Sequence, residues 1–445
     1  MNIFTINRSE IEDRLDPFFY NNKPDFSHYI KLSKIATVKG GKRIPLGKTY
    51  SDIPTDYLYL RVADMVDDTA DYNSLKSIDS EVYKILKNYE MVEGDIALSI
   101  AGSIGKVLCT RNIPSFKKVI LTENCAKIQV KKDIVLPEYM TLLLTLDTTQ
   151  KQIDLNYIQT TIPKLGLDRI RNIYIPKIPN LSKQQKIVSL YEELKNQANQ
   201  KKQESQILLE NIDTYLLNEL GITIAPKDNS LKNRIFTVTF KDITSGRFDP
   251  QAYIPSLEQL RAELKKTEFK YLKDVVTESN ILTKKIDKSD IYVGLENIES
   301  NTGYYISNLE KESISSALCF EKGQVLFPKL RPYLNKVHLA DFNGICSTEF
   351  HVFNAINIDV NFLHFCLLSK IILAQTENLM TGNTLPRLQS SDIANIMIPY
   401  PPLSKQKEIA DYIKSIREQA KKLQKEAEQI FTDAKRHVEK MILGE

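Results

Sequence analysis

Two segments of the chain carry a helical pattern of apolar positions that is longer than any other periodic stretch. In residues 403–445 an apolar or small residue recurs at alternating steps of four and three, and His437 takes one of these positions near the end. Residues 181–222 keep the same register, with Lys201 and Ser205 as polar exceptions at the centre. Alternating steps of four and three are typical of a coiled-coil seam. The apolar residues predicted to form the seam are Ile187, Leu194, Leu208, Ile212, Ile409, Ile413, Ile416, Leu423 and Ile430.

The two helical segments begin with nearly the same sequence, NLSKQQKIV from Asn180 and PLSKQKEIA from Pro402, and Ser182 is the expected N-cap of the first. A helix of about 39 residues is ~58 Å long, which exceeds what a compact domain of about 180 residues covers. Pairing of the helices therefore explains their length better than the simpler alternative, in which each helix docks on its own module. Because the intervening module leaves the end of the first helix and returns to the start of the second, we predict an antiparallel pair.

The modules that precede the two helices repeat each other in order. A Thr-Glu pair at Thr122 and Glu123 returns at Thr348 and Glu349. Longer matches are RLDPFFY (Arg14–Tyr20) with RFDPQAY (Arg247–Tyr253), EGDIALSIAGSIGKV (Glu93–Val107) with KGQVLFPKLRPYLNKV (Lys322–Val337), and TTIPKL (Thr160–Leu165) with NTLPRL (Asn383–Leu388). The offset between copies drifts, which is expected for two copies of one module with unequal surface loops.

Within each module, short β-type runs are interrupted irregularly by short helical segments, an order typical of the α+β class. We therefore predict an α+β protein with two similar domains, residues 1–180 and 223–402. An antiparallel coiled coil of two long helices, residues 181–222 and 403–445, separates these domains in a pseudo-two-fold symmetric arrangement.

The composition agrees with a multidomain soluble protein. A chain of 445 residues exceeds the size at which one core stops growing, and 42% of its residues are hydrophobic. The five cysteines are scattered without a C-x-x-C pair, which favours a reducing compartment and no zinc site. No apolar run reaches the ~18 residues of a membrane span, so we expect a cytoplasmic protein without a membrane partner.

Two similar modules at a fixed separation suit recognition of a bipartite duplex DNA site. Because the net charge is only +4, DNA contacts would have to come from local basic patches. The richest patch, Lys31–Lys48, has six basic residues, no acidic residue and a Gly-Gly pair that lets the backbone approach phosphates. The residues expected to contact DNA are Lys39, Gly40, Gly41, Lys42, Arg43, Lys48, Lys106 and Lys164 in the first module, and Lys284, Lys285, Arg331, Tyr333, Lys336 and Arg387 in the second.

Each of these assignments has a structural alternative. Lys106 and Lys336 stand at equivalent strand ends, where a lysine also lies over the edge of a core without binding a ligand. Lys164 and Arg387, in the matched proline turns, would alternatively cap the junction with the helices. Lys284 and Lys285 belong to a loop that also contains acidic residues, so that loop is the weaker of the two basic segments.

The order of two variable modules and two repeated helices, with IPKIPNLSKQQKIV and IPYPPLSKQKEIA at the junctions, resembles the specificity subunit of Type I restriction-modification systems. The SIAGSIGKV, LRPYLNKV, TTIPKL and NTLPRL stretches are similar to parts of that family's target recognition domains. The resemblance covers essentially the whole chain. It implies a non-catalytic DNA-recognition subunit in which each target recognition domain reads one half of a bipartite, asymmetric target and the helices set the spacing.

The resemblance also implies partners for the chain. It implies double-stranded DNA, two methyltransferase (modification) subunits recruited around the helices, and restriction subunits that join them. Those subunits would hold S-adenosylmethionine, ATP and Mg²⁺, and this chain would hold no cofactor.

Two other classes of function stay open from the sequence. A self-contained DNA methyltransferase or nuclease is one, but DPFFY (Asp16–Tyr20) departs from the D-P-P-Y signature of adenine methyltransferases. The stretch GSIGK lacks the first glycine and the Ser or Thr of a P-loop, because Ile100 and Val107 stand there. A coiled-coil scaffold without DNA binding is the second alternative. We predict no catalytic, cofactor or metal site in this chain.

Overall fold

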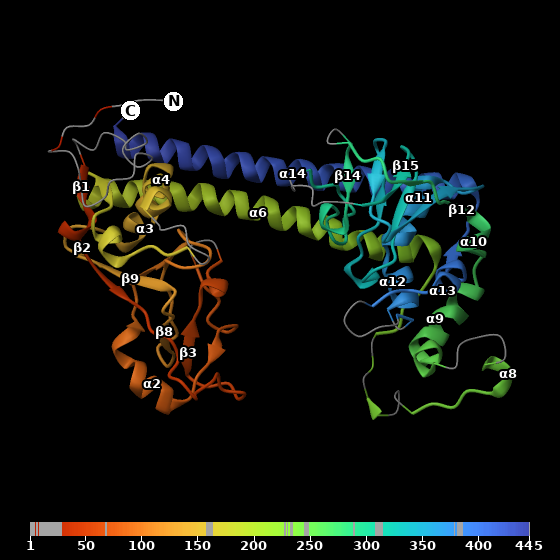
Figure 1. Cartoon of the computed structure of the whole chain (residues 1–445), viewed down its shortest axis with the longest axis horizontal. Helices are drawn as coiled ribbons and strands as arrows, with labels where there is room; N and C mark the ends of the chain where they lie inside the picture. The colour runs from red at the N-terminus through yellow and green to blue at the C-terminus, as the bar shows by residue number, and fades with distance from the viewer. Residues whose placement is uncertain are drawn as a thin grey trace. The chain divides into compact units, whose positions relative to one another are not determined.

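The protein divides into two compact units. The computed structural model describes residues 5, 8, 29–66, 69–156, 163–226, 228, 230–231, 235–243, 249–287, 290–307, 315–377, 379–380 and 386–444, apart from the side chains of residues 241 and 242. Unit 1 comprises residues 1–200 and 426–445, and unit 2 comprises residues 201–425. Each unit holds one domain of mixed helices and strands together with part of both long helices (Figure 1).

Unit 1 is built on two four-stranded sheets. The first sheet is antiparallel and has the order β2 (Ala36–Gly40), β9 (Cys125–Val130), β6 (Ile96–Ser99), β7 (Val107–Cys109). The second has the order β4 (Lys76–Ser77), β3 (Tyr57–Leu60), β8 (Lys118–Leu121), β5 (Glu90–Met91). A two-stranded sheet pairs β1 (Tyr29–Lys31) with β10 (Tyr174–Pro176). The helices are η2 (Leu32–Lys34), η3 (Val62–Asp64), α2 (Ser80–Leu86), η4 (Lys87–Tyr89), α3 (Pro137–Thr145), α4 (Asp147–Asn156) and α5 (Leu167–Arg171).

Unit 2 contains the same three kinds of sheet. The antiparallel sheet has the order β12 (Val276–Ser279), β19 (Phe350–Ala355), β16 (Val325–Pro328), β17 (His338–Leu339). The mixed sheet has the order β13 (Leu282–Thr283), β15 (Ala317–Phe320), β18 (Gly344–Cys346), β14 (Tyr292–Val293), and β11 (Phe269–Tyr271) pairs with β20 (Met397–Pro399). The helices are α8 (Phe240–Ile243), η5 (Pro250–Tyr253), α9 (Pro255–Lys265), α10 (Leu272–Val275), η6 (Leu295–Asn297), η7 (Pro332–Leu334), α11 (Val360–Leu368), α12 (Lys370–Thr376) and α13 (Ser390–Ala394).

The two units share the topology of their antiparallel sheets and of three strands of their mixed sheets. In each mixed sheet one pair of strands is parallel, β3 with β8 in unit 1 and β14 with β18 in unit 2. The fourth strand of the mixed sheet is at opposite edges in the two units, because β4 lies beside β3, the counterpart of β14, whereas β13 lies beside β15. This repeat confirms the prediction of an α+β protein with two similar domains and two long helices.

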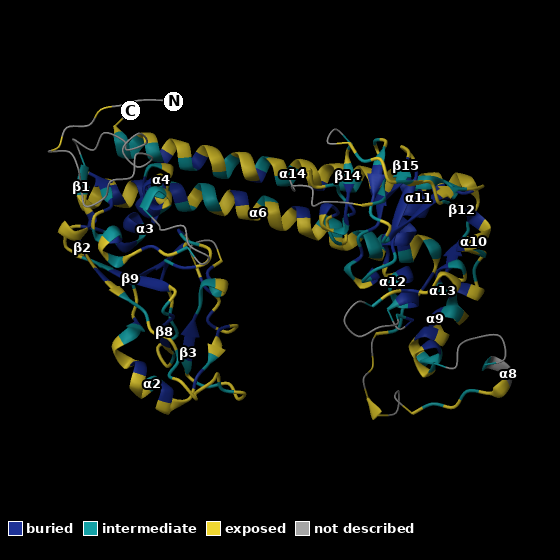
Figure 2. Ribbon diagram, viewed as in Figure 1, coloured by how far each residue is buried: buried dark blue, intermediate teal, exposed yellow. Residues whose placement is uncertain are grey.

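The long helices are α6 (Leu181–Leu220) and α14 (Leu403–Leu443). The N-cap of α6 is Asn180, whose side-chain oxygen accepts a hydrogen bond from the Lys183 N–H at 2.9 Å, and Ser182 already lies inside the helix. The expected N-cap was therefore two residues too late. The exposed and buried faces alternate along both helices (Figure 2).

Within each unit the two helices run antiparallel. In unit 1 the early α6 residue Tyr191 lies 6.4 Å from the late α14 residue Phe431, measured between ring centroids. In unit 2 the late α6 residue Tyr215 lies 4.1 Å from the early α14 residue Tyr412. The buried Ser205 hydroxyl donates to the Ala420 carbonyl of α14 at 2.9 Å, so this polar position in the seam is satisfied. The predicted antiparallel coiled coil agrees with these contacts.

Burial along the helices follows the predicted register with one shift. Ile187, Ile409 and Ile413 are buried, and the remaining predicted positions are half-buried, namely Leu194, Leu208, Ile212, Ile416, Leu423 and Ile430. His437 is exposed, whereas the next residue, Val438, is fully buried. An α-helix has 3.6 residues per turn, so a seam spaced at 3.5 drifts around a straight helix. Near the end of α14 this drift moves the buried position forward by one residue.

A buried glutamine attaches the start of α6 to its own domain. Gln184 is fully buried and accepts a hydrogen bond from the Leu136 N–H at 2.9 Å. Its amide nitrogen donates to the carbonyls of Ile134 and Pro179, each at 2.8 Å. The carboxamide thus joins the segment before α3 to the first turn of the long helix.

The same attachment recurs at the start of α14. Gln406 is buried, accepts a hydrogen bond from the Asp359 N–H at 2.9 Å and donates to the Pro401 carbonyl at 2.8 Å. Asp359 precedes α11, the counterpart of α3. The repeated S-K-Q at the helix starts therefore has a structural reason, because this glutamine fixes each domain to its long helix.

Three buried histidines of unit 2, His338, His351 and His364, make its stability sensitive to acid, because burial lowers the pKa of each. Burial and, to a smaller extent, the nearby Arg417 cation together lower the pKa of His364 to about 3 from its ordinary 6.5. Burial also lowers the pKa of His338. Between pH 6.5 and 3 the unfolded chain therefore takes up a proton on His364 that the folded unit does not. Uptake by the unfolded state favours unfolding, so stability is complete above pH 6.5 and falls as the pH drops below it.

We expect His364 alone to cost unit 2 about 2 kcal/mol of unfolding free energy between pH 7 and pH 5. Urea unfolding of the full chain, followed by hydrogen exchange of unit 2 peptides at both pH values, measures this loss. In a His364→Leu variant the pH dependence should become shallower by about 1.4 kcal/mol per pH unit, even if the variant is less stable at pH 7. An unchanged slope would contradict the assignment.

Candidate nucleic-acid interface

The β6–β7 hairpin loop of unit 1 is closed on a buried serine. The Ser99 hydroxyl donates to the Ser103 carbonyl at 2.6 Å and accepts from the Lys106 N–H at 2.8 Å. Gly105 has a φ of +90°, which favours glycine there. The Lys106 ammonium lies 3.4 Å from the Met65 carbonyl, which follows η3. Lys106 thus reaches from the first sheet to the second.

The β16–β17 loop of unit 2 makes an equivalent connection. The half-buried Lys336 ammonium donates to the Leu295 carbonyl of η6 at 2.9 Å. Beside it, the buried Asn335 amide donates to the Leu368 carbonyl at 2.7 Å. Lys106 and Lys336 therefore both have a structural role within their own unit, as the structural alternative proposed, and DNA contact by them stays a prediction.

Four segments of unit 1 meet beside this hairpin loop. The Gly41 N–H donates to the Cys125 carbonyl at 2.9 Å, and the Ile100 N–H donates to the Asn124 carbonyl at 2.8 Å. The Leu165 N–H donates to the Ile100 carbonyl at 2.9 Å. A Cβ on Gly41 would lie 2.0 Å from the Thr122 carbonyl oxygen, so this glycine is required for packing of the turn. We call residues 41–43, 99–106, 121–125 and 163–165 loop cluster 1.

Loop cluster 1 gathers several of the predicted cations around one acid. Arg43 Nε lies 2.6 Å from Glu123 Oε1. Lys42 and Lys164 of the cluster, and Lys39 in the preceding strand β2, are exposed and form no ion pair with any residue that the structure describes. Burial alone would raise the pKa of the Glu123 carboxyl, but hydrogen bonds from Arg43, the backbone and the neighbouring threonine lower it on balance. The carboxylate therefore stays charged and holds one cation of the cluster.

The corresponding segments of unit 2 meet in the same way. The Lys329 N–H donates to the Glu349 carbonyl at 2.7 Å, and the Arg331 N–H donates to the Pro386 carbonyl at 2.8 Å. The Leu388 N–H donates to the Lys329 carbonyl at 3.3 Å. We call residues 329–336, 347–350 and 386–388 loop cluster 2.

Loop cluster 2 also contains an arginine bound to a glutamate. Arg387 Nε and Nη2 donate to the two Glu349 oxygens at 3.1 and 2.8 Å. The hydrogen bond from Arg387 lowers the pKa of the Glu349 carboxyl. Tyr333 is 47% exposed in the same loop, so part of its side chain is accessible for stacking.

Five predicted contacts lie outside these clusters, namely Lys39, Gly40, Lys48, Lys284 and Lys285. Lys48 pairs with Glu81 of α2, with 2.9 Å between Lys48 Nζ and Glu81 Oε2. Lys284 and Lys285 are exposed after β13 and form no ion pair within the part of the chain that the structure describes. Gly40 lies at the end of β2, where a Cβ would meet only the Leu167 side chain at 3.5 Å. The Asp16–Tyr20 segment lies outside the described residues.

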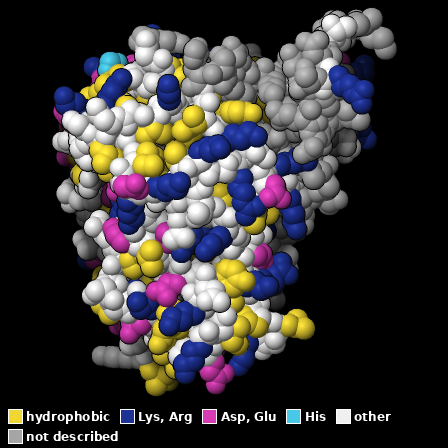
Figure 3. Space-filling model, turned by 90° about the vertical axis from the view of Figure 1, so that its left-hand side faces the viewer, with side chains coloured by type: hydrophobic (Ala, Val, Ile, Leu, Met, Phe, Trp, Pro, Cys, Tyr) yellow, Lys and Arg dark blue, Asp and Glu magenta, His cyan; other side chains and the backbone are white. Residues whose placement is uncertain are grey.

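Three residues of the clusters were not predicted from the sequence to belong to the site, namely Glu123, Glu349 and Lys329. The repeated Thr-Glu pair was the available signal, but its role was not apparent because both arginine partners are distant in sequence. Figure 3 shows Lys and Arg side chains interspersed with acidic and hydrophobic ones on the face at the unit 1 end. The candidate interface is therefore defined by the two loop clusters and their contacts.

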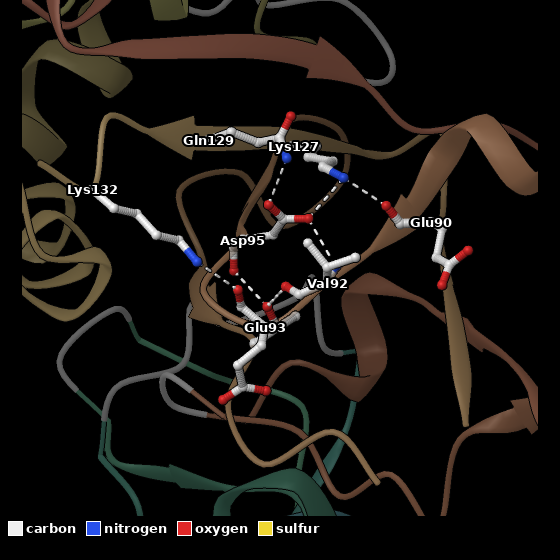
Figure 4. Close-up of polar contacts among 8 residues, drawn as sticks. Glu90, Val92, Glu93, Asp95, Lys127, Gln129 and Lys132 are labelled. Carbon is white, nitrogen blue, oxygen red and sulfur yellow. Dashed lines mark hydrogen bonds and ion pairs between the residues drawn. The ribbon is translucent and has the colours of Figure 1, made fainter. Parts of the chain in front are cut away.

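A buried ion pair lies between the two four-stranded sheets of unit 1. Lys127 Nζ lies 2.7 Å from Asp95 Oδ2, and both side chains are nearly inaccessible. Asp95 also accepts hydrogen bonds from the Val92 N–H and the Gln129 amide, each at 2.8 Å (Figure 4). Lys127 also donates to the Glu90 carbonyl at 2.6 Å. These contacts join β5, β6 and β9.

Among the described residues, the geometry of the acidic, histidine and cysteine side chains and the apolarity of the helices bear on two other kinds of site. There, no three or more His, Cys, Asp or Glu side chains are grouped as they would be to hold a metal ion. Over the same residues, none of the helices has the length and apolarity to cross a membrane.

The chain has two domains of similar topology. Each domain is attached to a long helix and carries a cluster of cationic loops. This arrangement is that of a two-domain recognition protein. The family model described as Type I restriction modification DNA specificity domain matches residues 27–211 and 264–430. Because these matches cover more than half of the chain, the chain belongs to this family.

Individual relatives agree with this family. The chain is 33% identical over 129 residues to the specificity subunit of the Escherichia coli Type I restriction enzyme EcoDI, which covers 28% of the chain and 29% of the relative. It is 25% identical over 143 residues to the EcoBI specificity subunit from the same organism, which covers 32% of the chain and 29% of the relative. A solved structure from work on the structural basis of complex assembly and conformational transition of the Type I restriction-modification system has the same fold. It has a TM-score of 0.50 at 13% identity and covers 93% of this chain and 96% of that one.

Proposed function

We propose that the chain is the non-catalytic DNA-recognition subunit of a Type I restriction-modification complex. Each domain, residues 1–180 and 223–402, reads one half of a bipartite, asymmetric duplex target. The paired helices set the gap between the halves and recruit two methyltransferase subunits, which restriction subunits join. Those partners carry S-adenosylmethionine, ATP and Mg²⁺, and the complex acts in the cytoplasm.

The observation that carries this proposal is the double match of one DNA specificity domain to two units of the same topology. The units share their frame but differ in the residues of their loop clusters, so each can prefer different bases. Exposed cations such as Lys39, Lys42 and Lys164 supply phosphate contacts in unit 1. Because such contacts release counterions, binding should weaken steeply as salt increases.

Exchange of one domain tests the proposal directly. We expect replacement of residues 223–402 by the equivalent domain of a family member with another target to change only one half of the recognised site. The other half should stay the same because residues 1–180 are untouched. Sequencing of the duplexes that the full chain retains from a randomised pool, before and after the exchange, measures both halves. A change in both halves would contradict the model of two independent domains.

The same material tests the two alternative functions. Methyl transfer to duplex DNA by the purified chain, incubated alone with S-adenosylmethionine, would show a self-contained methyltransferase. Absence of salt-dependent binding to any duplex would favour a scaffold that does not bind DNA.

A further inference from the structure

The glutamate of the Thr-Glu pair holds an arginine in both units, but the arginine comes from a different segment each time. In unit 1 it is Arg43, from the segment after β2, and in unit 2 it is Arg387, from the segment before α13. When the alignment of β12 with β2 is continued along the sequence, Thr283 corresponds to Arg43, but Thr283 belongs to β13 and pairs with Ala317 of β15. Lys164 takes the place of Arg387, because the two form equivalent bridges to the hairpin loops. The two arginines therefore come from non-equivalent segments, although the two glutamates that they contact are equivalent.

Glu123 is held in one position by several donors. Besides Arg43, the Thr122 hydroxyl donates to its Oε2 at 3.0 Å, and the Tyr59 hydroxyl lies 3.2 Å from the same oxygen. Tyr59 is 3% exposed, and burial raises its pKa to about 12, so the hydroxyl keeps its proton. The Tyr59 hydroxyl also lies 2.8 Å from the Lys42 carbonyl, next to Arg43. The carboxylate is thus a fixed support and not a mobile surface acid.

The supported guanidinium groups face outward. The Arg43 side chain is 79% exposed, and only its Nε donates to Glu123, so its two Nη groups make no hydrogen bond to any described residue. In Arg387 the Glu349 carboxylate engages the Nε and Nη2 side of the fork, and the side chain is 46% exposed. A carboxylate bound at Nε fixes the orientation of the planar guanidinium group, so the edge formed by its two Nη groups points in one direction. That edge presents parallel N–H donors, which match the O6 and N7 acceptors of guanine in the major groove.

An ordinary exposed ion pair explains these contacts less well. Such pairs contribute little to stability, so nothing in folding alone requires an arginine against this acid in both domains. The pairs lie within the loop clusters, next to the exposed Lys42 and Lys164. A cation that only neutralised phosphate would need no fixed orientation, since phosphate is contacted as readily by a flexible lysine.

We propose that Arg43 and Arg387 each bind the major-groove edge of a guanine in the half-site read by their own domain, and that Glu123 and Glu349 are positioning residues that orient the two guanidinium groups. This inference rests on the proposed function and adds the residue in each domain that discriminates one base. It also explains how one frame reads two sequences, because the arginine approaches the DNA from a different loop in each domain.

Selection of duplexes from a randomised pool by the full chain tests the proposal. Arg43→Lys should relax the preference for guanine at one position of one half-site by roughly 10- to 100-fold, and Arg387→Lys should do the same in the other half. Glu123→Gln and Glu349→Gln should relax the same positions as their arginine partners. The double variant of each pair should be no more relaxed than the Arg→Lys variant alone. A residue with only a structural role would not change the preference for a single base.

Arg436→Lys is the matched control, because Arg436 is also an exposed arginine paired with an acid, Asp433, but lies on α14 away from the loop clusters. It should leave every base preference unchanged. If the unaltered chain selects no sequence at all, the proposed function fails. If it selects a bipartite site and the four loop variants keep every base preference, losing affinity equally for all duplexes, the proposed function stands and this inference is overturned.

Discussion

Insertion of one heptad into both long helices is expected to lengthen the gap of the DNA target by about three base pairs and to keep both half-sites. Seven residues add ~10.5 Å to a helix, and base pairs are ~3.4 Å apart. The insertions belong after Gln200 and after Lys425, because the fold divides there into its two units. In unit 1 the α6 residues up to 200 belong with the α14 residues from 426 onward. In unit 2 the α6 residues from 201 onward belong with the α14 residues up to 425. Each unit therefore keeps its own packing.

The original target should then be bound no better than unrelated DNA, a loss on the order of 10³-fold or more. Selection of duplexes with the same half-sites and gaps of graded length measures the new optimum. Duplicates of residues 194–200 and 419–425 preserve the register of the seam, because both have seven residues. As a control, a heptad inserted only in α6 shifts the two halves of the pairing relative to each other and should lower the melting temperature. An unchanged gap in the double insertion would contradict the role of the helices as the spacer.

Substitution of Lys127 by methionine is expected to destabilise unit 1 by about 3 to 5 kcal/mol, because it leaves the buried Asp95 carboxylate without its partner. The side chains of Lys127 and Asp95 are only 11% and 5% exposed, so solvent does not replace the lost cation. Urea unfolding of the full chain, followed by hydrogen exchange in β6 and β9, measures the change.

Unit 2 provides the compensating control. At the places of Asp95 and Gln129 it has Gln324 and Asn354, whose side chains share a hydrogen bond of 2.9 Å, and the place of Lys127 is taken by the buried Val352. The double variant with Asp95→Gln and Lys127→Val should therefore recover most of the stability, since neutral groups suit this site. A double variant less stable than Lys127→Met would contradict the conclusion that neutral side chains suit this site.

The architecture of the protein could be predicted from the sequence because it depends on long, regular patterns. The four-three spacing runs over two helices of 40 and 41 residues, so the tertiary context of a single position could not hide it. The exceptions are local. His437 and Val438 exchange places because a straight helix drifts from a seven-residue repeat. Gln184 is a polar residue in a first helical turn, which is ordinarily exposed, and only the tertiary structure shows that it is buried.

The candidate interface was less predictable because it depends on contacts between distant segments. Arg43 could be identified as a cation in a basic loop, but its partner Glu123 is 80 residues away. Lys48 belongs to the same basic loop, yet it pairs with α2 and lies outside loop cluster 1. Charge along the sequence therefore indicated which segment to examine, and folding determined which of its cations come together.

The central claim is that two similar domains on paired helices read two separated halves of one DNA site. The most direct measurement is a map of methylated positions in cells that contain the complex, with and without this chain. The account predicts methylation that depends on the chain and falls within an asymmetric motif of two short parts separated by a gap of constant length. A continuous motif, or two parts at varying distances, would contradict the claim.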